Sequence, residues 1–154
     1  MIKKLHYSLA NIASEWTHVT NQNISVIDIL ELGEFSLLPA TLISQGYSVS
    51  LADEISHPYL PIYGFINRAN FVVDSNGIVI RYFGRFLLDP YEVTQIKKYG
   101  EVEVVNATDV DIGLVFKFVD SQTITINELV ITHQAKIKFE DIYLSKFFDA
   151  RSSK

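Results

Sequence analysis

The side chains that most often perform chemistry are spread along this chain and do not form a motif. The four histidines lie far apart, at His6, His18, His57 and His133, and none of them has the spacing of a zinc-binding helix. The absence of cysteine excludes thiolate catalysis, disulfides and cysteine-based zinc sites. These observations predict a protein that needs no metal and no cofactor.

Two pairs of carboxylates have a spacing that could support acid–base chemistry or metal binding. Glu101 and Glu103 alternate with valines on an expected strand, so both carboxylates point to one side of it. A solvent-facing strand has the same pattern. Asp109 and Asp111 match the start of a calcium-binding loop but lack its later oxygen ligands and glycine, so we interpret them as part of a turn. Nucleophile-elbow and phosphate-loop motifs are also absent from the sequence, and we predict that the protein is not an enzyme.

The basic side chains concentrate between residues 68 and 98. Arg81, Phe83 and Arg85 alternate on an expected strand, which would combine cations with an aromatic ring on one face, as in single-strand nucleic-acid binders. A solvated strand face is the competing interpretation. If the protein binds nucleic acid, the candidate contact residues are Arg68, Arg81, Arg85, Lys97 and Lys98.

A second candidate surface lies between His57 and Phe71, where aromatic and aliphatic side chains surround two prolines. Tyrosine and phenylalanine dominate the energetics of many protein interfaces, although packing beneath a sheet would also explain them. The candidate protein interface consists of aromatic residues from this segment and acidic residues from an expected N-terminal helix: Tyr59, Tyr63, Phe65, Asp28, Glu31 and Glu34.

The composition describes a folded, acidic chain. Of its 154 residues, 48% are hydrophobic and 20% are charged, which provides core material and argues against disorder. The length suits one domain, or a small helical head joined to a compact body. The formal net charge of −5 and the isoelectric point near 5.3 disfavour a dedicated nucleic-acid or anionic-membrane binder, and they fit a protein that docks on a basic partner.

The N-terminal residues do not match a secretion signal. Lys3 and Lys4 are followed by a segment that His6, Ser8 and Asn11 interrupt, so no apolar run of about seven residues follows them. No stretch approaches the ~18 apolar residues that a membrane span requires. We therefore expect a cytoplasmic protein without membrane contact.

The first half of the chain predicts two helices followed by extended structure. Ser8 precedes a helical pattern whose apolar face includes Trp16, and Ser25 precedes a second pattern that Gly33 would stop. Three further segments are expected beyond them: an extended run at residues 36–43, a strand at 47–51 and a hinge at 53–61.

The second half predicts a mostly antiparallel sheet with two helices. Asn76 and Gly77 predict a tight hairpin turn. Asp89 can cap a helix that Pro90 starts and Gly100 ends, so we expect a helix over residues 90–99. The remaining pattern predicts strands at 62–66, 71–73, 78–83, 101–105, 113–119 and within 123–132, and a second helix at 139–148.

These elements define an expected α+β fold: an N-terminal helix-turn-helix-like helix pair followed by a mostly antiparallel sheet with two supporting helices. We expect a head with its following extended segment at residues 1–52, a mostly β body at 53–148, and a polar tail at 149–154.

The first forty residues resemble the helix-turn-helix of the excisionase and mercury-resistance-regulator class. Residues 7–13 correspond to its first helix and residues 25–33 to its second, which runs into an extended segment from Leu37. Residues 88–93 and 138–142 are similar to helix starts in small phage and prophage proteins that carry such heads. The resemblance implies a DNA-associated transcriptional or prophage regulator.

The charge of the expected head favours another function. Its two lysines, Lys3 and Lys4, are outnumbered by four acidic residues, which would repel phosphate where a recognition helix must approach DNA. We therefore expect non-catalytic binding of a protein partner, as a regulator, inhibitor or immunity-type neutraliser, with a basic partner such as a nucleic-acid-handling protein. DNA-associated regulation is the alternative, and homo-oligomerisation is left open.

Overall fold

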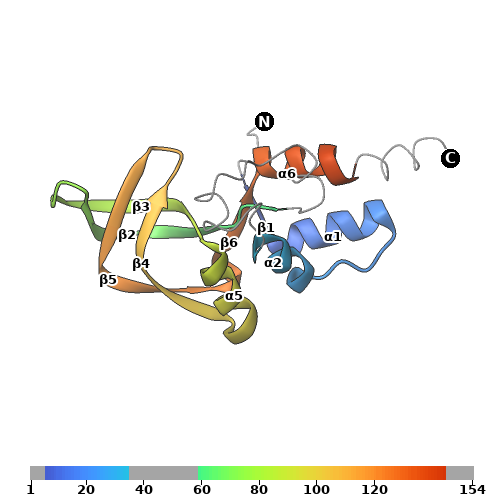
Figure 1. Cartoon of the computed structure of the whole chain (residues 1–154), viewed down its shortest axis with the longest axis horizontal. Coiled ribbons are helices and arrows are strands. Elements are labelled where there is room, and N and C mark those ends of the chain that lie inside the picture. Colours follow the sequence, from blue (N-terminus) through green and yellow to red (C-terminus); the bar gives the residue numbers. More distant parts are fainter. Residues whose placement is uncertain (1–5, 35–58, 145–154) are drawn as a thin grey trace, which may run out of the picture.

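The computed structural model describes residues 6–34 and 59–144, and it confirms the α+β class (Figure 1). Helices α1 (Leu9–Thr20), α2 (Val26–Glu34) and α6 (His133–Phe139) lie at one end of the molecule, and α5 (Pro90–Tyr99) lies below the sheet in this view. The strands and single turns of the described ranges are β1 (His6–Ser8), β2 (Tyr63–Asp74), β3 (Val79–Leu87), β4 (Glu101–Asp109), β5 (Leu114–Thr125), the 3₁₀ turn η1 (Ile126–Glu128), β6 (Leu129–Thr132) and the π-helical turn η2 (Glu140–Leu144).

Strand β2 is the centre of the sheet because it pairs with three other strands. β3 runs along one of its edges. On the other edge, β6 pairs with the start of β2 at Tyr63 and Gly64, and β5 pairs with its end from Val72 to Asp74. β1 extends the sheet beyond β6, β4 extends it beyond β5, and all of these pairs are antiparallel.

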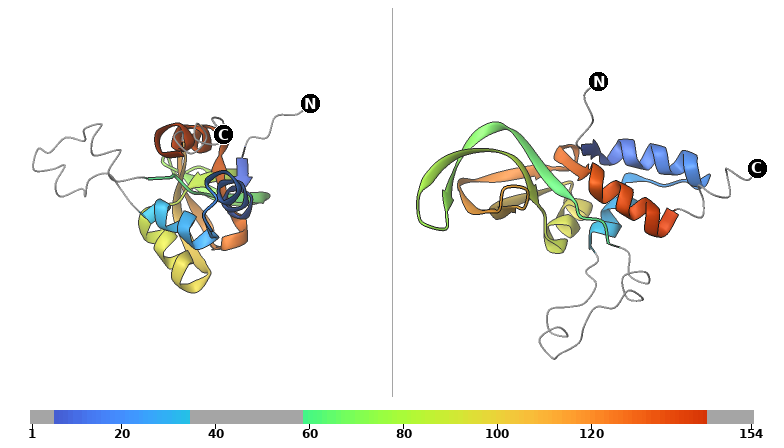
Figure 2. Two further views of the ribbon diagram at one scale, coloured as in Figure 1. Left: turned by 90° about the vertical axis from the view of Figure 1, so that its right-hand side faces the viewer. Right: turned by 90° about the horizontal axis from the view of Figure 1, so that it is seen from above.

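The strands predicted at residues 62–66 and 71–73 are one continuous strand, β2. A shift of register between Ile66 and Asn70 accommodates the polar residues that separate the two apolar runs. Such bulges increase the local twist of a strand, and β2 and β3 curve strongly together in Figure 2. A second shift of register lies between β4 and β5, with the extra residues on β5.

The hairpin between β2 and β3 turns where the sequence predicts it. Asp74 Oδ1 accepts hydrogen bonds from the N–H groups of Asn76 and Ile78, both at 2.9 Å. Gly77 has a φ of 81°, a conformation that glycine adopts without steric cost. The turn chemistry is therefore local, which is why it could be read from the sequence.

Three helix starts and one helix end are confirmed. Ser25 Oγ accepts a hydrogen bond from the Asp28 N–H at 3.2 Å at the start of α2. Ser8 caps α1 by accepting a hydrogen bond from the Asn11 N–H at 3.2 Å. Asp89 and Glu92 form a reciprocal capping box at the start of α5, and Gly100, with a φ of 82°, ends that helix.

Gly33 does not stop α2, contrary to the prediction, but lies within the helix. A Cβ atom at this position would sit 2.5 Å from Cδ1 of Ile62 and 3.4 Å from a methyl carbon of Val93. The glycine therefore permits close packing of α2, which the sequence pattern alone did not distinguish from a helix end.

The last predicted helix begins at His133 and not at residue 139. Thr132 caps it by accepting a hydrogen bond from the Ala135 N–H at 3.1 Å, a signal that the apolar spacing further along obscured. The helix continues into the π-helical turn η2, which extends the helical segment to Leu144.

Helices and strands share one hydrophobic core. The fully buried side chains of Ile12, Trp16 and Leu30 belong to the same cluster as those of Phe86 and Phe118. Side chains of the predicted head and body therefore pack together. Several predictions lie outside the described residues: the extended segments at 36–43 and 47–51, the boundary at 52–53, most of the hinge at 53–61, and the chain beyond Leu144.

Candidate protein-binding face

Strands β2, β3 and β5 direct alternate side chains toward the interior and toward solvent. The inward row is buried and includes Val72, Tyr82 and Phe118. The outward row also carries many apolar side chains, whereas a solvent-facing antiparallel sheet usually carries polar ones. We call this surface the outer sheet face and define it by eight residues: Phe71, Val73, Val79, Arg81, Phe83, Val115, Lys117 and Val119.

Strand pairing brings the residues of the outer sheet face next to one another. Phe71 on β2 lies opposite Arg81 on β3. Val73 on β2 lies between Val79 on β3 and Lys117 on β5. Cross-strand neighbours of this kind are in side-chain contact range, so the face is a continuous surface.

The outer sheet face is exposed as well as apolar. Five of its large apolar side chains are more than half exposed, from 53% for Val119 to 69% for Phe83. Single exposed hydrophobic residues are common on protein surfaces, but contiguous apolar surface usually marks a binding site. The face is therefore the strongest binding candidate in the described part of the chain.

Two cations lie within this apolar surface. Arg81 and Lys117 are exposed, and neither has an ion pair with another described residue. The cations that do form ion pairs within residues 6–34 and 59–144 are Arg68, Arg85, Lys97 and Lys136. The outer sheet face is thus apolar with a positive charge, on a chain whose net charge is negative.

The structure does not bring together the five cations predicted for nucleic-acid binding. Arg85 donates hydrogen bonds from Nε and Nη2 to Oδ2 of Asp111, at 3.0 and 2.7 Å. Arg68 Nη1 lies 3.8 Å from Oε2 of Glu128. The other three are placed separately: Arg81 on the outer sheet face, and Lys97 and Lys98 on α5.

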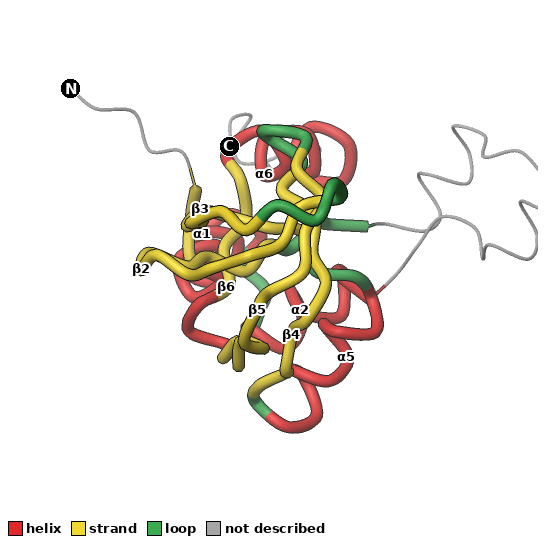
Figure 3. Tube along the Cα trace, turned by 90° about the vertical axis from the view of Figure 1, so that its left-hand side faces the viewer, coloured by secondary structure: helices red, strands yellow, loops and turns green. Residues whose placement is uncertain are grey.

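The acidic residues predicted for the protein interface have intramolecular partners. Asp28 accepts hydrogen bonds from Ser25 at the start of α2. Lys97 of α5 lies 3.1 Å from the carboxylate of Glu34 and 4.0 Å from that of Glu31. Helices α2 and α5 are neighbours in Figure 3. Glu31 and Glu34, predicted for the protein interface, therefore pair with Lys97, which was predicted for nucleic-acid binding.

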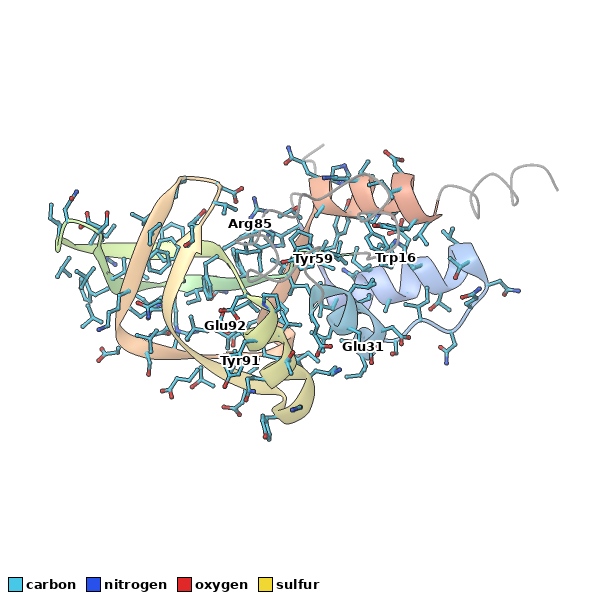
Figure 4. All side chains as sticks on the ribbon, viewed as in Figure 1. Trp16, Glu31, Tyr59, Arg85, Tyr91 and Glu92 are labelled. Carbon is cyan, nitrogen blue, oxygen red and sulfur yellow. The ribbon has the colours of Figure 1, made fainter. Side chains whose placement is uncertain are left out.

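The aromatic candidates Tyr59, Tyr63 and Phe65 are half-buried. The Phe65 ring lies 5.0 Å from that of His6. Tyr59, labelled in Figure 4, lines an apolar hollow of about 160 Å³ whose far wall includes Phe139 of α6. Burial raises the pKa of both tyrosine hydroxyls above its usual value. Tyr59 therefore faces α6, and Phe65 packs against His6 of β1.

Sequence reasoning missed a buried polar cluster between α1 and α6. Trp16 Nε1 donates a hydrogen bond to Oε2 of Glu140 at 2.8 Å, and Figure 4 shows Trp16 between the two helices. Lys136 Nζ lies 2.8 Å from Glu140 and 3.0 Å from Glu15. The i, i+4 spacing of Lys136 and Glu140 was the only local signal, because the Trp16 contact joins positions 124 residues apart.

A second missed contact links β3 to β4. The Tyr82 hydroxyl donates a hydrogen bond to Oδ2 of Asp109 at 2.8 Å, and Oδ1 of Asp109 accepts one from the N–H of Asp111 at 3.0 Å. Burial, followed by this hydrogen bond, raises the pKa of Tyr82 far above its usual value. The segment interpreted as a turn therefore also holds the two strands together.

The candidate chemical residues remain separate in the structure. Glu101 and Glu103 are exposed on β4, and Ser121 Oγ donates a hydrogen bond to Glu103. Within residues 6–34 and 59–144, no three side chains of the metal-binding types are grouped in a way that could hold an ion. The same residues include no helix long and apolar enough to cross a membrane. His57 lies outside the described residues.

Glu92 lies at the start of α5 and lines a groove of about 270 Å³, together with residues of β3 and β4 and Val115 of β5. Burial raises its pKa from 4.5 to about 7, and the charge of Asp89 adds to this, while a hydrogen bond from the Asp89 backbone opposes it. The folded state therefore binds this proton more tightly than the unfolded state does. Glu92 accordingly lowers the free energy of unfolding as the pH rises from 4.5 to about 7.

We expect Glu92→Gln to weaken this pH dependence, because the amide oxygen keeps the acceptor for Asp89 and does not ionise. We measure the free energy of unfolding in urea at a series of pH values. The difference between the variant and the wild type should favour the variant most above about pH 7 and least near pH 4.5. Glu101→Gln, at an exposed position on β4, is the control for loss of one charge. Parallel pH profiles for the Glu92 variant and the wild type would contradict the expectation.

The outer sheet face offers apolar area and two cations, and none of its eight residues is a carboxylate, a histidine or a hydroxyl- or thiol-bearing residue. Such a surface can bind a partner by burial of apolar area and by charge pairing. Comparisons of the chain with protein-family models, curated proteins and solved structures gave no match.

Proposed function

We propose that this protein is a non-catalytic protein-binding module, a regulator, inhibitor or neutraliser of its partner, and that the outer sheet face makes the contact. The observation that carries the proposal is the second apolar row of the sheet. On β3, Phe86 is fully buried in the core, whereas Phe83 on the opposite side is 69% exposed. The core row already accounts for folding, so the exposed row is available for binding.

The size of the apolar row supports this proposal. Full burial of one such side chain is worth about 1.5–3 kcal/mol, and five of them keep more than half of their surface exposed. A partner that covered all five would gain several kcal/mol. That gain is on the scale needed to offset the loss of translational and rotational freedom on association.

DNA binding by the helix pair has less support. A recognition helix needs one open side with cations directed at phosphate. In α2, one side packs against α5 (Figure 3). The carboxylates of Glu31 and Glu34 lie 4.0 and 3.1 Å from Lys97 of α5. Three of the five cations considered for nucleic acid, Arg68, Arg85 and Lys97, are paired with carboxylates.

Photo-crosslinking tests the proposed surface. The crosslinking amino acid p-benzoylphenylalanine is placed at position 83 of the full chain, which is then expressed in its native host, irradiated and treated with nuclease. We expect a discrete, nuclease-resistant protein adduct, because Phe83 lies in the outer sheet face. Tyr91 on α5 is the matched control, because it is also aromatic and also 69% exposed (Figure 4).

The control position should give no discrete adduct. Equal adducts from positions 83 and 91 would mean that exposure alone causes crosslinking. An adduct at position 83 that nuclease removes would replace the protein partner with nucleic acid. Either result would overturn the proposed function.

A further inference from the structure

We propose that the partner of the outer sheet face is acidic: a protein segment with an apolar centre flanked by aspartate or glutamate. This inference rests on the proposed function and names the chemistry of its partner. It departs from the basic partner that the net charge of the chain alone suggests, because the charge of the binding face is opposite in sign to that of the whole chain.

The positions of Arg81 and Lys117 carry the inference. Arg81 lies directly opposite Phe71, and Lys117 lies opposite Val73, so both cations stand within the apolar rows. A partner that covers these rows removes water from both cations. Burying a cation without a partner is costly, so a well-fitting partner must present carboxylates at these two places.

Asp89 and Glu92 line a groove that includes Val115 of the face. No described carboxylate, however, lies within ion-pair distance of Arg81 or Lys117. Glu101 and Glu103 also point outward, but they lie at the start of β4, where they pair with Thr125 and Thr123 of β5. The two cations are therefore available to a partner.

A second copy of the chain fits this face poorly. A symmetric dimer uses the same patch on both subunits, and the patch contains cations and no carboxylate.

Nucleic acid also fits this face poorly, for a different reason. A polyanion requires a row of cations along its backbone, whereas this face has two cations among six apolar side chains.

The experiment uses a displayed library of random twelve-residue peptides, selected against the full chain. We expect the enriched peptides to combine apolar residues with aspartate or glutamate. Affinities of labelled peptides are then measured by fluorescence anisotropy. The double variant Arg81→Glu/Lys117→Glu should weaken binding at least tenfold, since each lost charge pair contributes a factor of this order.

Two matched variants separate the possible outcomes. Lys98→Glu changes the charge of an exposed lysine on α5 and should leave the affinity unchanged. Phe71→Ser/Phe83→Ser removes the two exposed rings and should abolish binding. All three variants alter exposed positions, and equal unfolding midpoints by circular dichroism would show that the fold is kept.

Loss of binding with the serine variant but not with the charge reversal would overturn the acidic-partner inference and leave the proposed binding face intact. Binding that resists both variants, or no enriched peptide at all, would count against the proposed face itself. Enrichment of basic peptides, a dimer in sedimentation that Phe71→Ser/Phe83→Ser dissociates, or tight binding of a labelled oligothymidine would each overturn the inference in favour of a different occupant.

Discussion

Replacing Lys136 with alanine is expected to lower the free energy of unfolding by about 3–5 kcal/mol, because the substitution leaves a buried carboxylate without its cation. Lys136 and Glu140 have side chains that are only 7% and 9% exposed, and their charged atoms are 2.8 Å apart. After the substitution, the hydrogen bond from Trp16 is the remaining contact described for the Glu140 carboxylate. Urea unfolding followed by tryptophan fluorescence measures the loss.

Two further variants test the cause of this loss. Lys136→Met/Glu140→Gln removes both buried charges while keeping an oxygen for Trp16, so we expect it to recover most of the lost stability. Lys138→Ala, at an exposed position of the same helix, should have little effect. A small effect of Lys136→Ala, or no recovery in the double variant, would show that Lys136 does not stabilise the buried carboxylate of Glu140.

Phe86→Ala is expected to cost about 3–5 kcal/mol, whereas Phe83→Ala should change stability by less than ~0.5 kcal/mol. Phe86 is fully buried and packs against the rings of Phe116 and Phe118, with centroids 6.5 and 5.6 Å away. Phe83 lies three residues earlier on the same strand, on the outer sheet face. The difference between the two midpoints of thermal or urea unfolding measures the contrast.

This pair of variants also bears on function. If Phe83 contributes nothing to stability, its presence on the surface needs another explanation, which binding provides. A large loss of stability on truncating Phe83 would instead mean that its ring packs against the protein. In that case the outer sheet face would lose its most exposed apolar side chain as a binding residue.

Local chemistry explains what could be predicted of the fold. The turn after β2 depends on Asp74 and Gly77, and the start of α5 depends on Asp89 and Glu92. The two residues of each pair are close together in the sequence. The pairing of β2 with three strands could not be predicted in this way. It depends on contacts between distant segments, and alternation along a strand does not identify its neighbours.

The candidate site was predictable to a similar degree. Alternation placed Arg81 and Phe83 on one strand face, and the structure agrees. It did not reveal that Arg85 binds Asp111, since that partner lies on another segment of the chain. On β5 both alternating rows are rich in apolar residues, so the sequence could not show which row is buried and which is exposed.

The pairing of β1 with β6 has a consequence for synthesis of the chain. His6–Ser8 pair with Val130–Thr132, so this edge of the sheet cannot form until Thr132 has left the ribosome. Contacts between such distant segments slow folding, and until then the apolar side of α1, with Trp16, has no complete surface to cover it. Translation, more than the folded state, is therefore the period in which this protein is most open to aggregation and to capture by chaperones.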